Sequence, residues 1–330
     1  SATSSINSSA STTGPWPSWQ SRGLPQLTDM RPKRDSSYGC LKALLLLGRI
    51  SNLPTVWSNC LAAWLLAGGA MVGTADVQRF AWLIVGATLL YLAGMFLNDA
   101  FDERFDREHR TERPIPSGVI SAKAVWILGS IQMALGFGCV VWINPLAALF
   151  ALVLAGGILW YDWLHKRIIW SPLIMGLCRF FLYLLAGAVA VDCVTLPVIL
   201  GAVALCSYVV GLSNIAHRET TGGRVNSWPA WLLVLPLLLA FVLTYWRGDE
   251  EVAWRGLVVA AGLYALWTTR SLLFTFKSLM PQHSRTVSGL LAGIVLFDFL
   301  LAASQDMQMG LLFFGLFGLA LLLQRYIPAT

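Results

Sequence analysis

The sequence predicts an integral membrane protein built of α-helices, and three observations support that prediction. Of the 330 residues, 57% are hydrophobic and 12% are charged, whereas soluble domains average about 25% charged residues. Ten continuous apolar segments follow one another, and most are near the roughly 20 residues that a spanning helix needs. A transmembrane β-barrel would instead show short segments of alternating polarity.

Two regions divide the chain. Residues 1–38 are rich in Ser, Thr and Pro without a hydrophobic period, which predicts a disordered tail. Residues 39–330 hold every apolar segment and form the predicted transmembrane domain. The first segment is longer than one span requires, and only Asn144 and Pro145 separate the third from the fourth. The predicted spans are 41–72, 79–98, 122–143, 145–163, 170–191, 194–213, 228–246, 252–275, 286–304 and 308–325.

Basic residues gather on one side of this topology. With the N-terminal tail in the cytoplasm, most Lys and Arg residues fall in cytoplasmic loops, as the positive-inside rule requires. Only Arg79, Arg247 and Arg255 fall on the opposite side. The cytoplasmic group comprises Arg104, Arg107, Arg110, Arg113, Lys123, Lys166, Arg167, Arg218, Arg224, Lys277, Arg285 and Arg325. Because the basic residues lie between apolar spans, the net charge of +6 does not indicate a nucleic-acid partner.

An acidic stretch, Asn98–Asp106, follows the second span directly. Asp99, Asp102 and Asp106 are spaced i, i+3, i+7, so on a helix they share one face. Like charges on one face repel unless a cation lies among them, and oxygen ligands with room for water and phosphate suit Mg²⁺. The alternative is a solvated acidic face, but cytoplasmic membrane edges favour Lys and Arg. The stretch therefore predicts a metal–diphosphate site at a membrane boundary.

Several polar side chains lie inside the predicted spans. Arg49 and Asn52 lie two to three turns into the first span, where a polar group either lines a site or makes an interhelical hydrogen bond. For Arg179 and Asp298 the structural role is the stronger interpretation. The six cysteines are scattered and form no CxxC pair, so we expect small apolar packing groups rather than disulfides or metal ligands.

The stretch Asn98–Gly118, NDAFDERFDREHRTERPIPSG, resembles the first signature of the UbiA superfamily of membrane prenyltransferases. That signature is an NDxxDxxxD motif followed by an RTxRPxxSG-like segment. Residues 161–176 are similar to the family's connection between its fourth and fifth helices, and residues 48–55 are similar to its first helix. The first and fourth-helix motifs are most like the EboC-like branch of the family.

The resemblance implies an all-α bundle of nine to ten transmembrane helices around a central cavity. It also implies a polyprenyl diphosphate donor and Mg²⁺ held by acidic motifs. Asp99, Asp102 and Asp106 would be metal ligands and catalytic residues, with Asn98 beside them. Arg110, Arg113 and Lys166 are candidates for binding the diphosphate, and Arg49 and Asn52 for lining the cavity.

The second acidic motif of the family departs from its pattern here. It should end the sixth helix, where this chain has Asn214, His217 and Thr221 in place of Asp. Only Glu219 keeps its acid and remains a candidate metal ligand. Asn and neutral His bind a metal without neutralising its charge, so we expect a weak second metal, or a diphosphate held partly by Arg218.

The implied reaction separates a diphosphate anion from an allylic cation. Mg²⁺ and basic side chains absorb the negative charge of the leaving group, and aromatic faces stabilise the cation in a dry pocket. Tyr161 and Tyr208 are the best placed aromatic candidates, and the lipid tail would leave sideways into the bilayer. The leading hypothesis is prenyl transfer to a small aromatic acceptor. The alternatives are a terpene cyclase of the UbiA type and a non-catalytic isoprenoid carrier, both motivated by the altered second motif.

Overall fold

The structure is a computed structural model that describes residues 39–221, 228–248, 251–276, 283–303 and 309–328. Every regular element in these ranges is helical. The predicted tail, 1–38, lies outside them. The elements are α1 (Cys40–Leu47), the 3-10 turn η2 (Ile50–Asn52), α2 (Leu53–Leu66), α3 (Thr74–Phe101), α4 (Glu103–His109), α5 (Ala122–Val141), α6 (Pro145–Leu164), α7 (Ser171–Val191), α8 (Leu196–Thr221), α9 (Trp228–Trp231), α10 (Leu235–Arg247), α11 (Glu251–Phe276), α12 (His283–Ala302) and α13 (Gly310–Tyr326).

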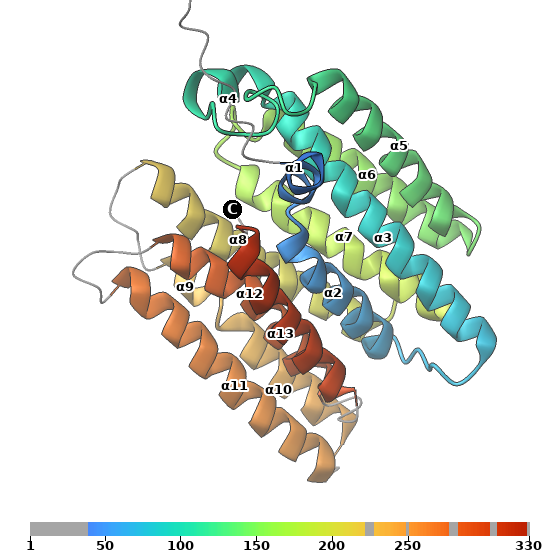
Figure 1. Cartoon of the computed structure of the whole chain (residues 1–330). Coiled ribbons are helices and arrows are strands. Elements are labelled where there is room, and N and C mark those ends of the chain that lie inside the picture. Colours follow the sequence, from blue (N-terminus) through green and yellow to red (C-terminus); the bar gives the residue numbers. More distant parts are fainter. Residues whose placement is uncertain (1–38, 222–227, 249–250, 277–282, 304–308, 329–330) are drawn as a thin grey trace, which may run out of the picture. The chain divides into compact units, whose positions relative to one another are not determined.

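The helices form the predicted membrane bundle (Figure 1). Within the described ranges, eight helical segments are long and apolar enough to cross a membrane, and α13 is a shorter apolar helix. Successive membrane-spanning helices pack side by side, as α3 and α5, α7 and α8, and α11 and α12 do. Helix α12 is buried along most of its length and also contacts α2, α8 and α13. The all-α membrane fold is thereby confirmed.

The first predicted span differs from the expectation of one long helix over 41–72. The chain ends α1 at Leu47 and starts α2 at Leu53. Between them Arg49 adopts the left-handed conformation, with φ 41° and ψ 51°, which a non-glycine residue adopts rarely. Pro54 lies in the first turn of α2, where its missing N–H leaves no hydrogen bond unmade. The break turns Arg49 and Asn52 toward the centre of the bundle.

Glycines allow α3 and α5 to pack closely. A Cβ added at Gly136 would lie 2.9 Å from the Leu90 backbone nitrogen and 3.0 Å from the Gly86 carbonyl oxygen. A Cβ added at Gly86 would in turn lie 3.0 Å from the Gly136 carbonyl oxygen. Close backbone approach through small residues is typical of helix pairs in membranes. This contact holds the middle of α3 against α5.

We expect Gly136→Ala to lower the free energy of unfolding by about 1–3 kcal/mol, because the added methyl group forces the two backbones apart. Gly138→Ala is the matched control on the same helix, since a Cβ there meets no atom of the described chain within 4 Å. Chemical denaturation of both variants in detergent gives the comparison. Equal stability of the two variants would contradict the close packing.

An ion pair joins three helices at the end of the bundle opposite the acidic motif. Arg79 near the start of α3 lies 2.6 Å from the Asp192 carboxylate just after α7. Asn144, which caps the start of α6, donates a hydrogen bond of 2.7 Å to Asp192. The hydrogen bond from Arg79 lowers the pKa of Asp192. These contacts fix the positions of α3, α6 and α7 relative to one another along their axes. The opposite ends of these helices carry the candidate site.

Candidate active site

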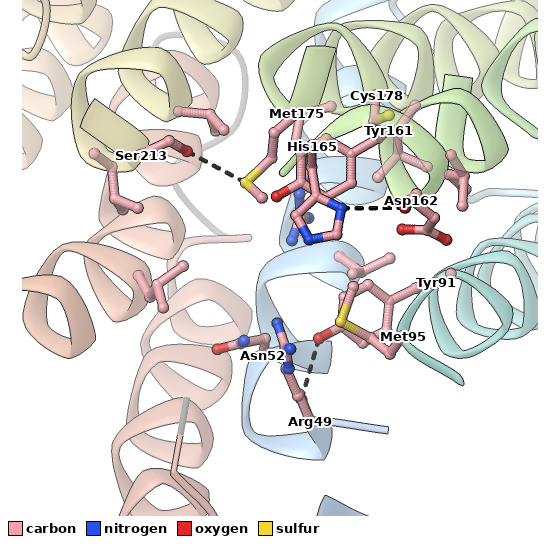
Figure 2. A pocket seen from close by; sticks show the side chains of 18 of the residues that line it. Arg49, Asn52, Tyr91, Met95, Tyr161, Asp162, His165, Met175, Cys178 and Ser213 are labelled. Atoms are coloured by element: carbon pink, nitrogen blue, oxygen red, sulfur yellow. Dashed lines mark hydrogen bonds between the residues drawn. The ribbon is translucent and has the colours of Figure 1, made fainter. Parts of the chain in front are cut away.

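A cavity of about 440 Å³ opens between α2, α3, α6, α7, α8 and α12. Its polar part is formed by Arg49, Asn52, Arg110, Arg113 and the last turn of α6. In Figure 2, Arg49 and Asn52 lie across the cavity from His165 and Tyr161. The remaining lining is mainly aliphatic, and includes Val56, Leu90, Leu154, Leu182, Leu291 and Ile294. The cavity therefore has one polar, cationic wall, and its largely apolar remainder includes a second cationic position, Arg179.

Arg113 holds two of the three motif aspartates. Its Nη1 atom lies 2.8 Å from Asp106 Oδ2 and 3.2 Å from Asp99 Oδ1. Arg49 approaches the same Asp99 oxygen at 3.6 Å. All three aspartates are buried, and Asp106 is 2% exposed. Since α3 ends at Phe101 and α4 begins at Glu103, the motif spans a helix junction, and two of its three carboxylates contact these arginines.

The third aspartate is held by the segment that follows α6. Asp102 Oδ1 lies 2.7 Å from Lys166 Nζ, and Asp102 Oδ2 lies 3.4 Å from His165 Nε2. The Lys166 ammonium also lies over the Phe105 ring, 3.8 Å from its centroid. The connection between α6 and α7 is thereby fixed against the acidic motif.

Protonation of His165 follows from its two neighbours. His165 Nδ1 lies 3.2 Å from the Asp162 carbonyl oxygen, which only accepts, so Nδ1 carries a proton. Burial is the largest influence on the pKa of His165 and lowers it, but the hydrogen bond with Asp102, the Asp102 charge and the hydrogen bond with the Asp162 backbone together raise that pKa above its usual value. Burial is also the largest influence on the pKa of Asp102 and raises it, but the hydrogen bonds and charges of His165 and Lys166 together lower that pKa. The charged form of Asp102 is therefore favoured by the Lys166 ammonium and the His165 ring.

Two buried carboxylate oxygens in the described chain have no hydrogen-bond partner. One is Asp106 Oδ1 and the other is Asp162 Oδ2. The other oxygen of Asp162 accepts a hydrogen bond of 3.1 Å from the Asn98 amide. Buried carboxylate oxygens are rarely left unpaired, and a missing cation is one explanation for such an atom.

These residues fit a magnesium ion that keeps water and phosphate ligands. Across the described ranges, no three His, Cys, Asp or Glu side chains are arranged to hold a metal by themselves. Mg²⁺ is commonly bound through one or two carboxylates together with substrate phosphates. Asp99, Asp102 and Asp106 supply such carboxylates, and the unpaired Asp106 oxygen is the most available of their atoms.

A known protein family matches about half of this chain. The UbiA prenyltransferase family matches residues 52–219, which include the acidic motif, the cavity helices α2, α3, α6 and α7, and all but the last two residues of α8. The chain belongs to the UbiA prenyltransferase family. The assignment to the EboC-like branch stays a prediction.

Curated relatives of this UbiA family member match it over part of its length. A protoheme IX farnesyltransferase from Chloroflexus aurantiacus is 37% identical over 29% of this chain and 17% of its own length. A 4-hydroxybenzoate octaprenyltransferase from Pectobacterium carotovorum subsp. carotovorum is 30% identical over 37% of this chain and 42% of its own length. The matched stretches thus span less than half the length of these relatives.

One solved structure shares the fold. A digeranylgeranylglyceryl phosphate synthase structure superimposes with a TM-score of 0.58 and 18% identity, over 81% of this chain and 99% of that chain. A UbiA homologue from Archaeoglobus fulgidus, bound to DMAPP and Mg²⁺, superimposes with a TM-score of 0.47 and 12% identity, over 87% of this chain and all of that chain.

The UbiA fold brings most of the predicted site residues together. Arg49, Asn52, Arg110, Arg113 and Tyr161 line the cavity. Directly behind this lining are residues that contact it or one another, namely Asn98, Asp99, Asp102, Asp106 and Lys166.

The end of α8 differs from the expectation in part. Asn214 donates a hydrogen bond of 2.8 Å to the Val210 carbonyl of its own helix, whereas its neighbour Ser213 lines the cavity. The side chains of His217, Arg218 and Glu219 lie outside the described residues. Tyr208 does not line the cavity, because it is fully buried and donates its hydroxyl hydrogen to the Leu290 carbonyl.

The predicted site omitted several residues that line the cavity of this UbiA family member, four of which carry a charged or aromatic side chain. Asp162 and His165 come from the same turn as Tyr161, and Tyr91 and Arg179 come from α3 and α7. An acid near the end of an apolar segment is costly in a membrane, so Asp162 carried a usable signal. Tyr91 carried none, since an aromatic residue in a span is ordinary packing in most cases.

Proposed function

We propose that this protein transfers a prenyl group from its diphosphate to a small aromatic acceptor, with Mg²⁺. The observation that carries the proposal is the arrangement of three buried aspartates among three cationic side chains and a histidine at one wall of a largely apolar cavity. Arg49, Arg113 and Lys166 are the cations that contact these aspartates, and His165 is the histidine. The aspartates can bind the metal, the cationic side chains can bind the diphosphate, and the aliphatic lining can pack against the isoprenoid chain.

Each part of the site has a task in this reaction. The C–O bond between the allylic carbon and the diphosphate breaks, and the diphosphate leaves with the electron pair. Bound Mg²⁺ would supply positive charge to that leaving group. Arg110, Arg113 and Lys166 would bind its oxygens, because charge-assisted hydrogen bonds to phosphate are strong. The acceptor forms a new bond to the allylic carbon and then loses a proton.

Aromatic and apolar groups would protect the allylic carbon from water. Tyr91 and Tyr161 line the cavity and present π-faces, which stabilise a cation without reacting with it. The Tyr91 hydroxyl donates to the Arg49 carbonyl at 3.2 Å, which holds its ring in place. The surrounding aliphatic side chains exclude water, which would otherwise capture the cation.

The positive-inside distribution of Lys and Arg supports a cytoplasmic position for the N-terminus and for this site. A bilayer location also suits a donor whose long apolar tail stays in lipid. The acceptor class is proposed from the relative that is named a 4-hydroxybenzoate octaprenyltransferase.

The test combines the full chain in nanodiscs with Mg²⁺, prenyl diphosphates of increasing length, and 4-hydroxybenzoate. We expect pyrophosphate release together with a prenylated aromatic product. Absence of pyrophosphate with every donor would contradict the proposal, and tight donor binding without release would indicate a carrier. A cyclic hydrocarbon formed without acceptor would instead indicate a terpene cyclase.

A further inference from the structure

A polar stripe descends along α2 from the acidic site into the bundle. Asn52 is the N-cap residue of α2, and its spacing from Thr55 and Asn59, i, i+3, i+7, places the three residues on one face of the helix. The stripe is about 10 Å long, at 1.5 Å per residue. Polar groups at this depth in a membrane protein are costly and mark functional sites. The stripe ends at Asp298 on α12, whose Oδ2 atom lies 2.7 Å from the Asn59 amide nitrogen.

Arg179 of α7 lies beside this stripe and lines the cavity. Its Nη1 atom donates to Asn59 Oδ1 at 2.7 Å and its Nη2 atom donates to Thr55 Oγ1 at 3.2 Å. Two of the five N–H donors of the guanidinium are used in this way. In the part of the chain that the structure describes, no Asp or Glu lies within salt-bridge distance of Arg179.

Asp298 is occupied by other donors. It is fully buried, and its carboxylate accepts hydrogen bonds from Ser58, Asn59 and Tyr183. The connection between Asp298 and Arg179 therefore runs through the Asn59 amide. Arg179 is thereby fixed in position while its cationic group makes no direct carboxylate contact, and it forms part of the cavity wall.

The position of Arg179 separates it from the diphosphate-binding groups. It lies eight residues into α7, counted from Ser171, which is about 12 Å along the helix. Its guanidinium carbon lies 6.0 Å from the centroid of the Tyr91 ring, and the Tyr91 hydroxyl donates to the Arg49 carbonyl. The wall of the cavity thus runs from Arg49 through the Tyr91 ring to Arg179.

We propose that Arg179 is the acceptor-recognition residue, which binds a carboxylate or another anionic oxygen of the acceptor beside the Tyr91 ring. The proposal rests on the proposed function, because it assigns the acceptor to the deeper cation and the diphosphate to Arg110, Arg113 and Lys166. A planar guanidinium matches a carboxylate with two parallel hydrogen bonds. Acceptors that carry an acid group on a small ring are therefore the favoured class.

The test is a binding measurement that needs no turnover. The full chain in detergent is titrated by calorimetry with 4-hydroxybenzoate and with 4-hydroxybenzamide, which has the same shape without the charge. We expect the acid to bind at least about tenfold more tightly, as a charge-assisted hydrogen bond contributes. Arg179→Gln should abolish that preference, and Arg179→Lys should retain part of it. Affinity for a prenyl diphosphate should change less than twofold in both variants.

Arg270→Gln is the matched control. Arg270 lies in α11, outside the cavity lining, and contacts the Trp267 and Phe274 rings. Its replacement should leave the preference for the acid unchanged. If Arg179→Gln fails to fold, Thr55→Val provides the test. This substitution hardly changes the side-chain volume but removes one hydrogen-bond acceptor of the Arg179 guanidinium. We expect it to weaken binding of the acid severalfold.

Two results would overturn the proposal. One is an equal affinity of the wild type for acid and amide, or no binding of either. The other is a folded Arg179→Gln or Thr55→Val protein that keeps the full preference for the acid. Selective binding of the acid without pyrophosphate release would support the acceptor site at Arg179 and contradict prenyl transfer. Pyrophosphate release without selectivity for the acid would support prenyl transfer and contradict the acceptor site.

Discussion

Asp99→Asn is expected to slow pyrophosphate release by about 10²–10³-fold, because the Asp99 carboxylate would help to hold the Mg²⁺ whose charge stabilises the leaving diphosphate. Asp99 lies at the centre of the cationic wall, where Arg113 and Arg49 approach the same oxygen at 3.2 and 3.6 Å. Asparagine keeps the shape of the side chain and removes its negative charge. The measurement is the single-turnover rate at saturating donor, together with the Mg²⁺ concentration that gives half of that rate.

Asp76→Asn is the matched control for this change. Asp76 lies in the first turn of the same helix, at the end opposite the acidic motif. Its replacement should leave both the rate and the Mg²⁺ requirement unchanged. An Asp99→Asn protein that releases pyrophosphate at the wild-type rate would remove Asp99 from the reaction.

The second large effect concerns stability. Arg113→Leu should lower the free energy of unfolding by about 3–5 kcal/mol, the usual cost of leaving buried charges without their partner. Asp106 is 2% exposed, and within the described chain Arg113 is its ion-pair partner. The denaturation midpoint in detergent gives the effect.

Arg107→Leu provides the comparison for Arg113. Arg107 forms an exposed i,i+4 ion pair with Glu103, and such pairs contribute about 0.3–0.5 kcal/mol. If Arg113→Leu lowers stability no more than Arg107→Leu does, other groups must compensate for the charge of the aspartates. That result would contradict the central position given to Arg113.

The spanning helices could be predicted because each carries its own signal. The segments 122–143 and 145–163 became α5, Ala122–Val141, and α6, Pro145–Leu164, almost residue for residue. Apolar length sets these helices, and Asn144 with Pro145 sets the turn between α5 and α6. The break at Arg49 was not predictable in the same way, since a positive φ at an arginine is imposed by packing rather than by local composition.

The site residues could be predicted only where they belong to one segment and follow a regular spacing in the sequence. The spacing of Asp99, Asp102 and Asp106 was visible in the sequence. The partners of these aspartates come from other segments, and no periodicity relates Asp102 to His165 or Asp99 to Arg49. The hydrogen bond of Asn214 to its own helix also depends on a rotamer that the sequence does not encode.

The pairing of acids with bases in the ligand-free site has a thermodynamic consequence. A divalent ion that arrives alone must detach carboxylates from their guanidinium or ammonium partners and leave those cations buried without an anion. Diphosphate that arrives alone must likewise detach the cationic side chains from the carboxylates and leave those carboxylates buried without a cation. When both arrive together the charges are balanced on each side, so metal and diphosphate should each tighten the binding of the other by the same factor, as linkage requires.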